Sequence, residues 1–167
     1  TNRIINYYDE TKEIAAINKE FELREQDVLF NYNSSKAMLN ELEKQMDSNI
    51  KRVIHNVQLV DKINQASDLT GKITQMETIS TSSEDSGRQL LEYKNKLLQT
   101  RRDLSEISNQ YVAGQYTKEG LNKGTIVEQW LDQLLLFEKA KAELKIVQKS
   151  RNELNAKYLH FAPVGTT

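Results

Sequence analysis

The chain has 167 residues, of which 38% are hydrophobic and 28% charged; its formal net charge at pH 7 is −1, and it has no cysteine. This composition is too polar for a globule with a thick core and suits a thin bundle, in which each helix buries one apolar stripe. The near-zero charge argues against a general nucleic-acid binder, which needs a basic excess to meet phosphates, and the lack of cysteine excludes disulfides and thiolate sites.

The first predicted element is a long helix over residues 4–64, a range without glycine or proline. Its apolar residues recur at intervals of three, four and seven, which is the spacing of a coiled-coil or narrow-bundle seam. Polar residues lie on or beside this stripe. We expect the asparagines among them to be exposed and the helix to kink near residues 31–35. These polar residues are Asn31, Ser34, Ser35, Asn49 and Asn56.

The segment over residues 65–71 is predicted to end this first helix at Gly71, because glycine is the residue that most often follows a helix end. A short second helix over residues 71–80 is then expected. Asp68 or Thr70 could cap it, since both side chains can accept a hydrogen bond from a free backbone N–H.

A serine-rich polar stretch over residues 80–87 is predicted to be a loop. A third helix follows over residues 87–112, with a heptad-like stripe of leucines. Charges of both signs lie between these leucines, and we interpret them as solvated pairs rather than as a binding patch. A fourth helix is predicted over residues 126–161, and Pro163 stops it because proline disfavours helix in the residue before it.

Residues 111–134, between the last two helices, are the most distinctive part of the sequence. They contain three of the six glycines and the only tryptophan. The glycines mark places where a helix can end, and Thr125 with Glu128 has the spacing of a capping box. Trp130 opens the apolar stripe of the following helix and is expected to be buried. The predicted corner and cap comprise Gly114, Gly120, Gly124, Thr125, Glu128 and Trp130.

No pattern of reactive residues predicts catalysis. The order Lys123-Gly124-Thr125 does not match a phosphate-binding loop, which needs Gly-Lys-Ser/Thr after a strand. His55 and His160 have no second ligand three or four residues away, as a zinc site would need. We therefore expect no catalytic residues, no cofactor and no metal. No segment reaches the roughly 20 apolar residues of a membrane span.

Two strings resemble a known family. Gly124-Thr-Ile-Val-Glu-Gln-Trp-Leu-Asp-Gln-Leu-Leu is similar to the periplasmic helical region of bacterial exopolysaccharide chain-length determinants, the polysaccharide co-polymerases. Phe161-Ala-Pro-Val-Gly-Thr resembles the family's Phe-Ala-Pro-Leu-Gly-Ser. Residues 7–21 and 68–72 also look similar, so the resemblance touches both ends and the middle of the chain.

The helical stripes predict an all-α fold, an elongated antiparallel coiled coil or bundle of three to four helices, forming one domain over residues 1–167. The resemblance implies a long helical periplasmic excursion of a protein that also has a small α/β base and two transmembrane helices. It implies that this domain is excised from a larger membrane protein, whose missing flanking segments supply the membrane anchor. The parent would be a homo-oligomer of the bacterial inner membrane, with this part in the periplasm. It would work with the polysaccharide polymerase and export machinery in making exopolysaccharide or capsule, and it is often fused to a cytoplasmic tyrosine kinase.

The expected function is therefore a non-catalytic structural and interaction module. Two alternatives remain open at this point. The same helices would suit a periplasmic adaptor hairpin of an efflux or secretion system. A glycan-binding surface is the other alternative, with possible polysaccharide contact through Trp130 and the tyrosines, and burial of Trp130 would close that role to it.

Overall fold

The computed structural model describes residues 2–78, 83–112 and 123–161 and contains five helices in these ranges. They are α1 (Asn2–Lys44), α2 (Ser48–Ile54), α3 (Val57–Thr78), α4 (Glu84–Val112) and α5 (Lys123–Phe161). Every regular element in the described residues is a helix, so the all-α prediction is confirmed.

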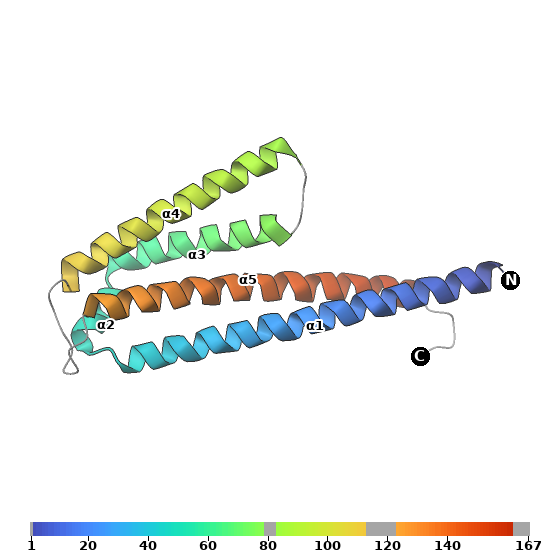
Figure 1. Ribbon diagram of the computed structural model, residues 1–167, viewed down its shortest axis with the longest axis horizontal. Helices are drawn as coiled ribbons and strands as arrows, with labels where there is room; N and C mark the ends of the chain where they lie inside the picture. Colours follow the sequence, from blue (N-terminus) through green and yellow to red (C-terminus); the bar gives the residue numbers. More distant parts are fainter. Residues whose placement is uncertain (1, 79–82, 113–122, 162–167) are drawn as a thin grey trace.

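The four long helices run roughly along a common direction, with α5 in the middle (Figure 1). On one side α5 packs against α1, and on the other it packs against α3 and, less extensively, α4. The short helix α2 lies at the end of the molecule where α1 turns into α3 (Figure 1). Helix α5 therefore contacts each of the other four helices.

The α1–α5 interface is a seam in which partly or fully buried residues of α1 alternate at intervals of four and three. Arg151 Nη1 donates to Glu25 Oε2 at 2.8 Å, and the rings of Tyr32 and Phe137 lie 4.8 Å apart between centroids. As the residue number rises on α1 it falls on α5, so the two helices are antiparallel. The α1 residues of the seam are Ile14, Asn18, Phe21, Glu25, Val28, Tyr32, Ser35, Leu39 and Leu42.

The main core lies around α2, at the end of the molecule where α1, α3, α4 and α5 all converge. Its most enclosed side chains come from four different helices: Ile50, Leu59, Leu104 and Val127. Asp47 caps α2, because its side chain accepts a hydrogen bond from the Ile50 backbone N–H at 3.0 Å. The apolar stripe of α1 thus continues into a corner rather than along a straight helix.

The predicted single helix over residues 4–64 is wrong. Helix α1 ends at Lys44, and the chain bends at Asp47 and again at Asn56, whose side chain accepts from the Gln58 N–H at 3.0 Å. The predicted helix end at Gly71 is also wrong, because α3 runs unbroken through this residue, and no separate helix over 71–80 exists. The helix breaks between α1 and α3 are therefore made by the polar side chains of Asp47 and Asn56, and not by glycine.

The other boundaries lie closer to their predicted positions. Helices α4 and α5 each begin three residues before the predicted 87 and 126, and within the described residues they extend to Val112 and Phe161. Helix α1 is continuous through residues 31–35, where a kink was predicted. Asn31 and Asn49 are exposed as expected, whereas Ser35 is buried in the seam.

Candidate functional site

The predicted corner is only partly within the described residues. Gly114 and Gly120 lie outside them. Helix α5 begins at Lys123, so Gly124 and Thr125 are in its first turn, and Thr125 does not occupy the N-cap position. Glu128 is exposed on the next turn.

The predicted burial of Trp130 is confirmed, with 8% of the residue exposed. Its indole Nε1–H donates to Glu43 Oε1 at 3.2 Å, which ties α5 to the end of α1. Buried indoles usually find such a partner. Because the ring is enclosed, Trp130 cannot stack on a sugar, and that part of the glycan-surface alternative is closed.

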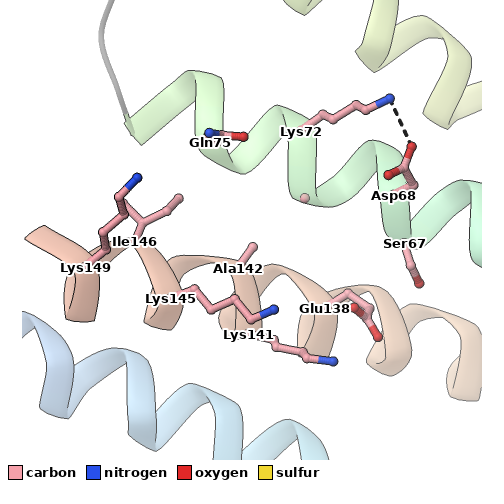
Figure 2. Close-up of a pocket in the computed structure, with 11 residues that line it drawn as sticks. Ser67, Asp68, Lys72, Gln75, Glu138, Lys141, Ala142, Lys145, Ile146 and Lys149 are labelled. Atoms are coloured by element: carbon pink, nitrogen blue, oxygen red, sulfur yellow. Dashed lines mark ion pairs between the residues drawn. The ribbon is translucent and has the colours of Figure 1, made fainter.

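A groove of about 580 Å³ lies between α3 and α5 (Figure 2). Ala142 and Ile146 point from α5 toward α3 and give the groove an apolar lining (Figure 2). Charged and polar side chains from both helices complete it. The lining residues are Ser67, Asp68, Gly71, Lys72, Gln75, Glu138, Lys141, Ala142, Lys145, Ile146 and Lys149.

The charges of the groove are unequally paired. Lys72 Nζ lies 3.1 Å from Asp68 Oδ2, and the hydrogen bond and charge of Asp68 raise the pKa of Lys72 (Figure 2). In contrast, Lys141, Lys145 and Lys149 have no carboxylate within 4.0 Å among the residues described here. The α5 side of the groove therefore carries a local excess of positive charge.

Gly71 lines the same groove from the interior of α3, where glycine is an unfavourable residue. A Cβ placed on it would meet nothing within 4 Å, and its φ is not in the left-handed region. Gly71→Ala is therefore expected to raise the free energy of unfolding by about 0.5–1 kcal/mol, measured by urea denaturation. A destabilised Gly71→Ala variant would show that a side chain is not tolerated at this position, contrary to the open space around it.

A further charged pair joins α3 to α4 on the other side of the bundle, with Lys62 Nζ 3.2 Å from Asp103 Oδ2. The hydrogen bond from Gln99, followed by that from Lys62, lowers the pKa of Asp103 below its ordinary value of 3.8. The charged carboxylate is the form that the fold favours.

Asp103 therefore contributes stability above its ordinary pKa, and this contribution is lost as pH falls through the lower pKa of the folded state. We expect Asp103→Asn to be less stable than the parent chain at pH 6 and the difference to shrink below about pH 3.8. Urea denaturation at several pH values measures this. A difference that stays constant with pH would argue against the charged pair.

The other candidate residues do not form a reactive centre. His55 is exposed, and the His160 side chain lies outside the described region. In residues 2–78, 83–112 and 123–161 no three His, Cys, Asp or Glu side chains come together as metal ligands would. None of the described helices combines the length and apolarity needed to cross a bilayer.

Sequence reasoning missed the groove, although its signal was present. Lys141, Lys145 and Lys149 are four residues apart, so they share a helix face. That signal gains meaning only when the neighbouring helix is placed beside it. Comparisons of the chain with protein-family models, with curated proteins and with solved structures found no match.

Proposed function

We propose that this chain is a non-catalytic structural and interaction module of a bacterial exopolysaccharide chain-length determinant. Two things support the proposal. One is the resemblance of residues 124–135 and 161–166 to that family. The other is the arrangement of long helices that expose apolar side chains along one outer face of α1, which is the observation that carries the interaction role.

The outer face of α1 is defined by Ala16, Leu23, Phe30 and Ala37, which repeat every seven residues on the side opposite the α5 seam. Leu23 is 54% exposed and Phe30 71% exposed. Another helix can pack against such a row of apolar side chains along one helix face. Leu23 and Phe30 are large apolar side chains that stay exposed on this face, and we propose that they belong to an interaction surface.

The partner that we propose for the outer face of α1 is a neighbouring copy of the same protein, so that the module forms part of an elongated antiparallel coiled-coil assembly in the periplasm. Since the face repeats as a single helical stripe, a second helix covers it better than a loop or a flat sheet. Held side by side, such copies would present the export machinery with a scaffold that influences how long a polysaccharide grows.

The test is a double substitution, Leu23→Glu with Phe30→Glu, introduced into the parent protein in the bacterium that makes the polysaccharide. Both side chains are exposed, so the fold should be little affected. We expect polysaccharide still to be made but its length distribution, resolved by gel electrophoresis, to become shorter and broader. Cross-linking of copies in the membrane should fall in parallel.

The matched control is Asn95→Glu with Asn109→Glu, which adds two carboxylates at exposed polar positions of α4. It should leave the length distribution unchanged. An unchanged distribution in the Leu23 and Phe30 double variant would contradict the proposal. So would flanking gene sequence without membrane-spanning segments on both sides, and lipoyl-like or β-barrel flanks would instead favour an adaptor of an efflux or secretion system.

A further inference from the structure

The α3–α5 groove presents a line of positive charge on α5. Lys141, Lys145 and Lys149 all line it, and steps of four residues place side chains about 6 Å apart along a helix axis. None of the three is neutralised by an ion pair in the described part of the chain. In a protein with a net charge of −1, this is a marked local imbalance.

Gly71 keeps this groove open. Its helical backbone does not require glycine, and its surroundings leave space for a Cβ, so close packing does not explain it either. A larger side chain at this position would extend from α3 into the space that Ala142 and Ile146 line from α5 (Figure 2). The absent side chain therefore leaves space between α3 and α5 beside the lysines, which are themselves exposed.

The mixture of groups in the groove identifies the chemistry of a ligand. The ammonium groups of the lysines are compact point charges that attract anions without demanding a planar partner. Asp68 and Glu138 line the same groove and can only accept hydrogen bonds when charged. A ligand that carries regularly spaced anionic groups together with hydroxyl donors would be complementary to both.

We infer that the α3–α5 groove binds an acidic polysaccharide. The lysines contact the carboxylates of the polymer, and Asp68 and Glu138 accept hydrogen bonds from its hydroxyls. The inference rests on the proposed function, because it specifies which class of polymer the module touches. A nucleic acid fits less well, because no aromatic side chain lines the groove for base stacking.

The experiment is calorimetric titration of the 167-residue chain with oligogalacturonate, a uronic-acid homopolymer, at low and at moderate salt. Replacing Lys141, Lys145 and Lys149 together with glutamine should weaken binding about tenfold or more, equivalent to about 1.4 kcal/mol per factor of ten. The salt dependence of binding should become shallower, because fewer ionic contacts remain. Neutral dextran should not bind.

Two further variants distinguish binding in the groove from a general effect of positive charge. Gly71→Leu retains every lysine but narrows the groove from the α3 side, and it should also weaken binding. A charge-matched control replaces three exposed lysines of α1, Lys12, Lys19 and Lys36, with glutamine and should bind as the parent chain does. Circular dichroism of each variant checks that the helices are intact.

No binding of oligogalacturonate would overturn the inference, as would equal losses in the groove and control variants. Polyglutamate binding as tightly as oligogalacturonate would overturn it too, because the groove would then respond only to negative charge. These failures are distinguishable from failure of the proposed function. The length distribution in the Leu23 and Phe30 double variant depends on the outer face of α1, which lies away from the groove.

Discussion

Replacing Trp130 with alanine is expected to lower the free energy of unfolding by about 3–5 kcal/mol, because a large buried ring is lost and a cavity remains. Trp130 belongs to the core cluster around α2, and its Nε1–H donates to Glu43 on α1. One substitution therefore removes both apolar packing and the polar link between α5 and α1.

Urea denaturation followed by far-ultraviolet circular dichroism measures this loss, since Trp130 is the only tryptophan and its fluorescence disappears with the substitution. Trp130→Phe is the companion variant. It retains an aromatic ring but loses the hydrogen bond to Glu43, so a smaller loss of about 1–2 kcal/mol is expected. A loss below about 1 kcal/mol for Trp130→Ala would contradict the buried position of the ring.

Ile50→Asp is expected to destabilise the fold by at least about 4 kcal/mol, because a carboxylate would be buried without a partner. Ile50 has 0% exposure and lies in α2, where it packs in the core cluster between the other helices. The corner around α2 should unfold as a unit. Thermal unfolding of the variant should begin at a temperature far below that of the parent chain.

The control for this variant is Asn49→Asp, which introduces the same carboxylate one residue earlier. Asn49 is exposed in the first turn of α2, where a negative charge is tolerated or mildly favourable. We expect its stability to stay within about 0.5 kcal/mol of the parent chain. Similar losses in both variants would show that α2 does not anchor the core.

Periodicity predicted the helical fold and the apolar stripes but not the turn between α1 and α3. Met46, Ile50 and Val53 continue the three- and four-residue spacing of the helix before them, because the corner buries its apolar residues as a helix would. The local signals of the break were Asp47 and Asn56, whose side chains bind backbone N–H groups. Without glycine or proline, such capping residues are easily mistaken for surface residues of one longer helix.

The prediction at Gly71 failed in the opposite way, because a helix end was predicted where the helix continues. Glycine alone predicted a helix end, but tertiary packing overrides local propensity when both flanks of a helix are held. Thr70 and Thr74 on either side of Gly71 are buried, and their hydroxyls donate to backbone carbonyls one turn earlier in α3. Thr70 and Thr74 thus hold the interior of α3 in a helical conformation. Gly71 can therefore lack a side chain beside the groove without ending the helix.

The burial of Trp130 could be predicted because it depends on a stripe within one helix. The groove could not, because it depends on which face of α5 meets α3 across a large separation in sequence. Lys141 and Lys72 belong to the same site only after the chain has folded back on itself. Local patterns carry no information about such pairings between distant helices.

The position of α5 at the centre of the bundle has a consequence for biosynthesis. Every other helix packs on α5, yet α5 follows all of them in the chain, so it emerges last from the ribosome. Until it appears, α1 lacks the helix against which its seam residues are buried, whereas α3 and α4 can already pack on each other. Completion of the core is therefore delayed until α5 has been translated.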